Sequence, residues 1–248
     1  MTLLLQVNGD IASRIVALLS GICWAEELQT SLEVYWWFMP NIRHCSFDRL
    51  FLSSSLPSWV TVKPGYIEHA VKIYSEEDFI EKKYPLVIQS KAKFYEKNSE
   101  KWLHYLRSLR PAFHLQSKIT MIPCVNTVGI YEHQCNESRM SQVLSVIWKQ
   151  FRSSHHYLVS TDSEETKRFS QIMFKSNVYF IDGTLSTHND LYLFNQIIHF
   201  FCFSKCIAIL DSSDSLLMRL AAMYGNIEHI PISLESPELF GAASPSTP

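Results

Sequence analysis

The stretch LLLQVNGDIASRIVALLSGICWAEELQTSLEVYW, residues 3–36, decides the fold of the first half of this chain. Leu3–Val7 is a short apolar run of the kind found in buried strands, and Asn8-Gly9-Asp10 breaks it. Apolar residues then recur at helical spacing from Ile11 to Leu28, and Leu32–Trp37 is rich in strand-forming residues. A strand, a tight turn, a helix and a second strand make one βαβ crossover, which predicts parallel strands with a right-handed connection.

The chain then becomes less regular and suggests a boundary between two lobes. Residues 38–88 contain three prolines and a run of serines, so we expect loops and short strands there. Lys91–Arg110 has apolar residues on one helical face, and Pro111 ends or kinks that helix. We therefore predict a first lobe over residues 1–115, a second over residues 116–235 and a tail over residues 236–248.

The second half alternates strands with helices, which predicts a doubly wound parallel sheet of the Rossmann type. Gly225 is well suited to end the last helix as a C-terminal cap. The predicted strands are Thr127–Tyr131, His156–Ser160, Asn177–Ile181, Cys206–Leu210 and Glu228–Ile232, and the predicted helices are Ser141–Phe151, Glu164–Phe174, Asp190–Phe203 and Leu216–Tyr224.

Composition and charge limit the possible functions. Of 248 residues 47% are hydrophobic and 19% are charged, which is typical of a globular protein. The formal net charge of −2 argues against bulk nucleic-acid binding, which requires a strongly basic surface. No apolar run is long enough to span a membrane, and the six scattered cysteines indicate free thiols. These features predict a soluble cytoplasmic protein.

Polar residues follow three of the predicted strands, where open parallel sheets bind ligands. They are Tyr131–Gln134, Ser160–Asp162 and Asp211–Ser215. The third cluster precedes a helix, so its backbone N–H groups and its hydroxyls suit a phosphate, although helix capping alone also explains serine and aspartate there. Asp162 has the same two interpretations, as a ligand of a ribose or base or as a helix cap.

Gly9 lies in the turn after the first strand, where a glycine lets the backbone approach a ligand closely. The chain contains no GxGxxG, GxxxxGK[ST] or GxSxG motif, which removes the dinucleotide fingerprint, the P-loop and the usual hydrolase elbow. His155-His156 lies at the start of a predicted strand, and we interpret this pair as part of a solvent-exposed strand edge and not as a metal site. No metal ligand is predicted.

In order along the chain, several motifs resemble those of the fucosyltransferase-like glycosyltransferases, which include the nodulation α1,6-fucosyltransferases and the protein O-fucosyltransferases. The opening stretch is similar to their pattern GGLGNRLRALLSAxxLAxxLxxxLxVxW. Later matches are Cys45–Phe51, Leu106–Pro111, Val128-Gly129-Ile130, Leu158–Asp162 and Arg219–Ala222. In the opening stretch the matching residues are Gly9, Arg14, Ala17, Leu18, Leu19, Ser20, Ala25, Leu28, Leu32, Val34 and Trp36.

The resemblance implies an α/β fold of the GT-B type, with two Rossmann-like lobes, parallel sheets and the nucleotide-binding lobe at the C-terminal side. It implies transfer of a fucose-like sugar from a GDP-linked donor to a glycan or other hydroxyl acceptor, without a bound metal or a permanent cofactor. The implied binding residues are Gly9 and Arg14 of the first lobe and Asp162, Ser212, Ser213 and Ser215 of the second.

The sequence departs from the family where an arginine would bind the β-phosphate of the donor. Alignment on Val128-Gly129-Ile130 places His133 and Gln134 where the family has two arginines. Loss of such a preorganised charge typically lowers the rate on the order of a hundredfold. A protonated His133, or Arg139 reaching back, would provide a weaker substitute. We therefore predict a glycosyltransferase with His133 and Gln134 at the diphosphate; the alternative is a catalytically impaired binding or scaffold protein.

Overall fold

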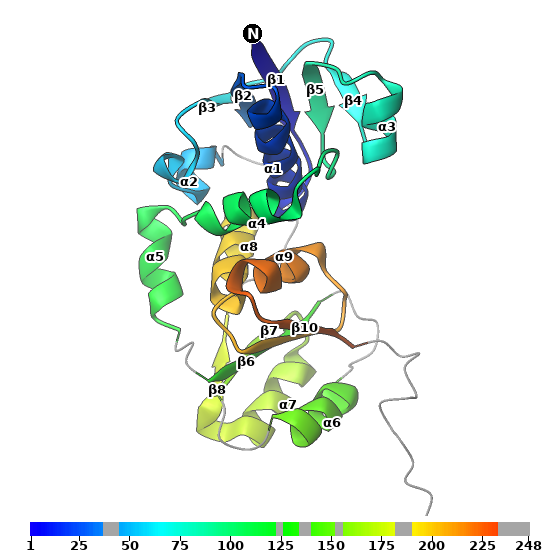
Figure 1. Cartoon of the computed structure of the whole chain (residues 1–248). Helices are drawn as coiled ribbons and strands as arrows, with labels where there is room; N and C mark the ends of the chain where they lie inside the picture. Colours follow the sequence, from blue (N-terminus) through cyan, green and yellow to red (C-terminus); the bar gives the residue numbers. More distant parts are fainter. Residues whose placement is uncertain (37–44, 123–125, 134–139, 152–155, 182–189, 233–248) are drawn as a thin grey trace, which may run out of the picture.

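The computed structural model of the chain describes residues 1–36, 45–122, 126–133, 140–151, 156–181 and 190–232 (Figure 1). Within these residues the strands form two separate five-stranded sheets, and every pair of neighbouring strands is parallel. Helices flank both sheets. The predicted α/β architecture with two parallel sheets is confirmed.

The first sheet has the strand order β3-β2-β1-β5-β4. The predicted βαβ crossover is confirmed, because β1 pairs in parallel with β2 and α1 connects them. The less regular stretch that follows supplies the remaining strands, so it completes this sheet. The bounds are β1 Thr2–Val7, β2 Ser31–Trp36, β3 Val60–Pro64, β4 Val71–Ile73 and β5 Val87–Ser90.

Helix α1 is buried along most of its length, and α4 packs against it. The predicted helix over Lys91–Arg110 begins only at Ser99, because the side chain of Asn98 caps it by accepting a hydrogen bond from the Lys101 N–H at 3.0 Å. Trp102 and Leu106 are buried as the spacing predicts. The helical segments of this half are α1 Ile11–Glu27, α2 Phe47–Leu50, η1 Ser53–Ser55, α3 Glu76–Glu81 and α4 Ser99–Ser108.

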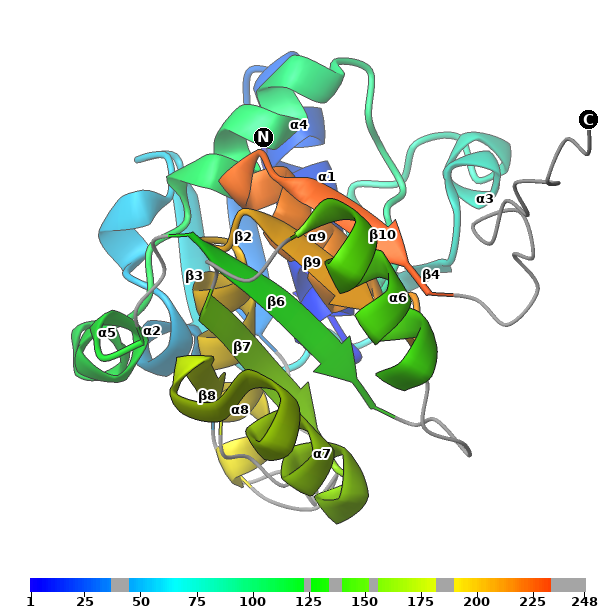
Figure 2. The ribbon, with the colours of Figure 1, turned by 90° about the horizontal axis from the view of Figure 1, so that it is seen from below.

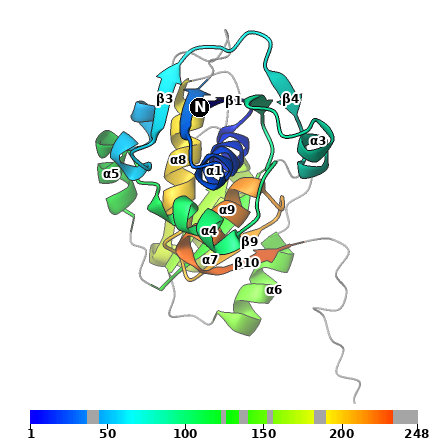
Figure 3. The same cartoon turned by 45° about the horizontal axis from the view of Figure 1, so that its top comes forward.

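Within the described residues the first sheet packs helices against one of its faces, whereas parallel sheets usually bury both. On β2, Leu32, Val34 and Trp36 are buried while Glu33 and Tyr35 between them are half-buried. Residues 65–70 cross this second face from one edge strand to the other (Figure 3). Their central Ile67 N–H donates a 2.7 Å hydrogen bond to Gln6 Oε1 on the middle strand, which explains how Gln6 is fully buried.

The second sheet has the order β10-β9-β6-β7-β8, and helices cover both of its faces (Figure 2). Helices α6 and α7 lie on one face and α8 and α9 on the other, which confirms the predicted double winding. The strands are β6 Thr127–Glu132, β7 His156–Thr161, β8 Val178–Phe180, β9 Ala208–Asp211 and β10 Glu228–Pro231; the helical segments are α6 Met140–Gln150, α7 Glu164–Phe174, η2 Lys175–Asn177, α8 Asp190–Phe203 and α9 Leu216–Gly225.

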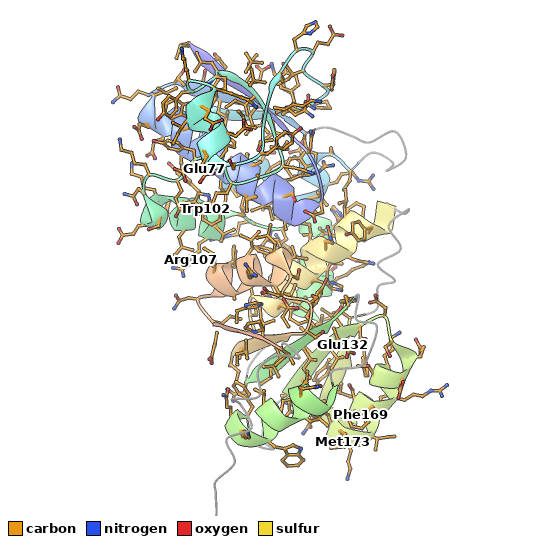
Figure 4. The ribbon with its side chains drawn as sticks, turned by 90° about the vertical axis from the view of Figure 1, so that its right-hand side faces the viewer. Glu77, Trp102, Arg107, Glu132, Phe169 and Met173 are labelled. Atoms are coloured by element: carbon orange, nitrogen blue, oxygen red, sulfur yellow. The ribbon has the colours of Figure 1, made fainter. Side chains whose placement is uncertain are left out.

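The two halves share one hydrophobic core. Side chains of α8 and α9 pack against α1 and α4, and the rings of Phe51 and Phe201 lie 6.3 Å apart across the junction. Arg107, at the junction in Figure 4, donates to the backbone oxygen of Met223 at 3.1 Å and to Asn226 Oδ1 at 3.0 Å. Helix α5, Phe113–Thr120, packs on α8 and runs across the predicted boundary between residues 115 and 116.

The end of α9 differs from the prediction in one respect. Gly225 is the last helical residue, and Asn226 adopts the left-handed conformation of the cap, with φ 55°. The glycine is needed for a different reason: a Cβ on Gly225 would lie 1.9 Å from the backbone oxygen of Ser204. Gly225 thus permits close contact between α9 and the end of α8.

We expect Gly225→Ala to destabilise the protein by about 3 kcal/mol or more, because the carbonyl that it meets belongs to the backbone and cannot rotate away. Urea unfolding of Gly225→Ala beside Leu216→Ala, which truncates an exposed side chain in the first turn of the same helix, measures this. Equal stability of the two variants would contradict the close packing of α9 on α8.

Candidate functional site

The predicted strand-end clusters of the second half meet at one edge of the sheet. Strand β6 lies in the middle of the sheet, with β7 on one side and β9 on the other. The chain therefore extends the sheet from β6 in two opposite directions, first through β7 and β8 and then through β9 and β10. Such a switch point opens a crevice beyond the carboxyl ends of the strands. The register places Tyr131 beside both Ser160 and Asp211, and Glu132 beside Thr161. The described residues of all three clusters therefore lie together at the carboxyl ends of these strands, where such a crevice forms.

Asp211 organises the serine cluster that we predicted as the phosphate site. Its carboxylate is fully buried; Oδ1 accepts hydrogen bonds from the N–H and hydroxyl of Ser213 at 2.9 and 2.8 Å, and Oδ2 accepts from the Ser215 N–H at 2.6 Å. His229 Nε2 lies 3.1 Å from the same Oδ2. Sequence reasoning placed Asp211 in the cluster but gave it no role, although an aspartate followed by serines indicates a self-bonded turn.

The three predicted serines differ in what they offer to a ligand. Ser212 is buried, and its hydroxyl and N–H both donate to the backbone oxygen of Tyr131. Ser215 caps α9 by accepting from the Leu217 N–H at 3.2 Å, so the capping interpretation applies to it. Ser213 is exposed while its hydroxyl donates to Asp211. The loop is thus held in one shape beside the N-terminus of α9.

His133 lies at the end of β6 within a buried chain of polar side chains. Its Nε2 is 2.6 Å from the hydroxyl of Ser160, which is 3.4 Å from Nε2 of His199 on α8. On its other side, Nδ1 of His133 contacts the carboxylate of Asp162. His133 Nε2 and the Ser160 hydroxyl share a hydrogen bond whose donor depends on the tautomer of the imidazole. The predicted residues His133 and Asp162 are therefore brought together.

Both histidines are uncharged at neutral pH. Burial lowers the pKa of His133 to about 4, with Asp211 opposing the shift, and burial together with the neighbouring His133 lowers the pKa of His199 to about 3. A diphosphate would have to raise the pKa of His133 by several units before this imidazole could act as a cation. Ser160 and His199 carried no assigned role in the sequence; only the fold shows that they join His133.

Asp162 and Glu132 occupy different environments at the crevice. Asp162 is about half exposed and does not cap α7, because Ser163 does so by accepting from the Thr166 N–H at 3.1 Å. Glu132, labelled in Figure 4, is buried and accepts a hydrogen bond from the Thr161 hydroxyl at 3.2 Å. Asp162 is thus the carboxylate that remains accessible here.

The loop between β1 and α1 carries the predicted residues of the first half. Gly9 has φ +88°, a conformation that favours glycine, and Asp10 caps α1 by accepting from the Ser13 N–H at 2.8 Å. Arg14 is almost fully buried: Nε donates to the Gly9 oxygen at 2.8 Å, and the guanidinium lies over the Trp36 ring. Arg14 therefore stabilises the Gly9 loop from the protein interior and does not extend into solvent.

This first loop faces the crevice of the second half. The Ile11 N–H donates to Gln196 Oε1 of α8 at 3.3 Å, and Gln196 in turn donates to the Tyr192 hydroxyl at 2.8 Å. The carboxylate of Asp10 contributes to raising the pKa of Tyr131 and of Tyr192, after the larger effect of burial. The predicted residues of both halves thus border one region.

Gln134 and Arg139, which we predicted at or near the diphosphate, lie outside the residues that the structure describes.

Within the described ranges no three His, Cys, Asp or Glu side chains are grouped closely enough to hold a metal ion. No helix there has the length and apolar character needed to cross a bilayer. A cavity of about 100 Å³ between α6 and α7, lined by Ile147 and Phe174 among others, lies at the opposite edge of the sheet from the crevice.

Comparison with solved structures identifies the fold. Fucosyltransferase NodZ from Bradyrhizobium superposes with a TM-score of 0.68 at 11% identity, covering 94% of this chain and 96% of NodZ. The chain has the fold of the fucosyltransferases. A mutant of Arabidopsis thaliana FUT1 in complex with GDP gives 0.63 at 11% identity over 96% of this chain and 72% of FUT1. POFUT1 in complex with GDP-fucose gives 0.61 at 7% identity over 94% and 97%.

No family model matches the sequence, and no curated protein does. The resemblance inferred from short ordered motifs is therefore confirmed at the level of the fold. The GT-B character of the two-sheet architecture is confirmed by the same structures.

The buried histidines predict a pH dependence of stability. A histidine whose pKa is lower in the folded than in the unfolded protein contributes its full stability above the unfolded pKa of about 6.5. That stability is lost as the pH falls toward the folded pKa, which is about 4 for His133 and about 3 for His199. The melting temperature should therefore fall by several degrees between pH 7 and pH 5. His199→Gln should show a weaker fall, whereas His104→Gln, which removes an exposed histidine, should follow the original curve. An unchanged slope in His199→Gln would contradict this.

Proposed function

We propose that this protein is a glycosyltransferase that transfers a fucose-like sugar from a GDP-linked donor to a hydroxyl group of a glycan or other acceptor. The observation that carries the proposal is the convergence of the β6 and β9 strand ends with the loop after β1, in a fold that NodZ, FUT1 and POFUT1 share. POFUT1 has been solved with GDP-fucose and FUT1 with GDP. We assign the nucleotide to the second lobe, residues 116–235, and the acceptor to the first, residues 1–115.

The reaction is an inverting displacement at the anomeric carbon. The acceptor oxygen forms a bond to that carbon while the bond from the carbon to the diphosphate oxygen breaks, and the diphosphate leaves with the electron pair. The N-terminus of α9 beside the serine loop suits the phosphates. The N–H groups of Ser212, Ser213 and Ser215 already donate within the chain and hold that loop in shape. Asp162 suits the nucleoside, because it is accessible and held in place by His133.

The acceptor hydroxyl must also lose its proton, and three carboxylates are candidates for the base. Glu132 is buried against Thr161, and Asp48 accepts a hydrogen bond from Ser53 at the surface. Asp10 is exposed, uses one carboxylate oxygen to cap α1, and belongs to the loop that faces Tyr131. Asp10 is therefore the candidate that the geometry favours.

The alternative is a protein that holds a nucleotide sugar without transferring it, and the state of His133 favours this alternative. Where the related family has an arginine, this chain has an uncharged imidazole whose Nε2 is hydrogen-bonded to Ser160. A neutral group offers little stabilisation to the charge that develops on a departing diphosphate. Binding and turnover must therefore be measured separately.

Calorimetric titration with GDP, UDP, GDP-fucose and UDP-glucose tests the proposal. We expect micromolar binding of GDP and GDP-fucose and at least tenfold weaker binding of the UDP compounds. Release of GDP on addition of a glycan acceptor would support transfer, and binding without release would support the alternative. If none of the four compounds binds, the assignment of this crevice to a nucleotide sugar is wrong.

His133→Arg tests whether the end of β6 faces the phosphates. A guanidinium there should strengthen GDP binding about tenfold, because it adds a charge-assisted hydrogen bond to the diphosphate. His156→Arg, at the opposite end of the neighbouring strand β7, is the matched control and should leave GDP affinity unchanged. Circular dichroism checks that both variants fold. Equal GDP affinity in folded His133→Arg and the unsubstituted protein would place residue 133 away from the diphosphate.

A further inference from the structure

Lys91 lies at the carboxyl end of β5 in the first sheet, directly beside Gly9. Strand β1 is central in this sheet, with β2 on one side and β5 on the other, so its switch point lies between β1 and β5. The Asn8 N–H donates to the Ser90 backbone oxygen at 3.0 Å, which keeps the ends of these two strands together. A Cβ on Gly9 would lie 3.4 Å from the Cβ of Lys91, which follows Ser90. Lys91 and the loop after β1 are thus in contact.

The turn that carries Lys91 is fixed by the side chain of Ser90. Its buried hydroxyl donates to the Ile73 oxygen at 3.0 Å and accepts from the Ala92 N–H at 3.1 Å. Lys91 sits between these two residues, and its side chain is exposed. The backbone of Lys91 is therefore preorganised while its ammonium group is accessible to solvent.

The charges that border the two facing loops are mainly negative. Asp10 and Asp162 are exposed there, and Asp211 is buried beneath the serine loop. Arg14 is buried under the first loop, and Arg219 is paired with Asp214. Within the described ranges no ion pair involves Lys91. A diphosphate brought between these loops requires a cation, and Lys91 is exposed at the position where the first lobe can supply one.

We propose that Lys91 binds the diphosphate of the nucleotide sugar from the first lobe, in place of the arginine that the second lobe lacks. This inference rests on the proposed function, since it concerns the same ligand. The ammonium group of Lys91 stabilises the negative charge of the diphosphate, which increases as the bond to the anomeric carbon breaks.

Comparison of GDP with guanosine in calorimetric titrations tests the proposal on the full chain. Lys91→Gln should weaken GDP binding about tenfold and leave guanosine binding unchanged, because only GDP carries the charge that Lys91 contacts. Lys91→Arg should retain most of the GDP affinity. The matched control is Lys118→Gln on α5, which removes the same charge from an exposed position away from β5 and should change neither affinity.

The salt dependence of GDP binding gives a second measurement. The slope of affinity against salt concentration should be smaller in Lys91→Gln than in Lys118→Gln, since one fewer cation neutralises the phosphates. Unchanged GDP affinity in Lys91→Gln, with GDP still bound by the unsubstituted protein, overturns the role of Lys91 and leaves the proposed function standing. Equal weakening of GDP and guanosine also overturns it. Failure of the unsubstituted protein to bind GDP overturns both.

Discussion

The packing of α8 and α9 against α1 is the interaction on which the rest of this structure depends. These helices cover one face of the second sheet and also bury the apolar surface of the first half, so a single core joins the two halves. Phe200, Phe201 and Phe203 of α8 lie at its centre, and Gly225 and Gly129 permit the closest contacts. Because α8 also contributes Gln196 and His199, the same packing positions the crevice.

The crevice is shaped by side chains that bond to one another. Asp211 fixes the serine loop, Ser90 fixes the turn before Lys91, and Arg14 supports the loop at Gly9. Each of these groups is buried, and each satisfies a neighbouring backbone group that would otherwise lack a partner. A loop held in this way loses little entropy when a ligand binds, which favours recognition of a rigid, charged group such as a diphosphate.

The central chemical question is how this chain provides positive charge to a diphosphate. The end of β6 carries His133, which is neutral because burial lowers its pKa, and His133 in turn contributes to lowering the pKa of His199. The facing lobe carries an exposed lysine beside the first loop. The fold therefore permits a cation to come from the first half of the chain, beside the loop at Gly9.

Most of the secondary structure followed from the sequence by itself, because periodicity and capping are local. The helices Glu164–Phe174 and Asp190–Phe203 have the predicted bounds, and the opening βαβ unit and the fucosyltransferase-like motifs were recognisable. The tertiary structure decided what depends on distant contacts. These are the packing of α5 on α8, the joining of His133 to Ser160 and His199, and the position of Lys91 beside Gly9. Sequence spacing could not show these because strand order and helix packing, which bring such residues together, are properties of the whole fold.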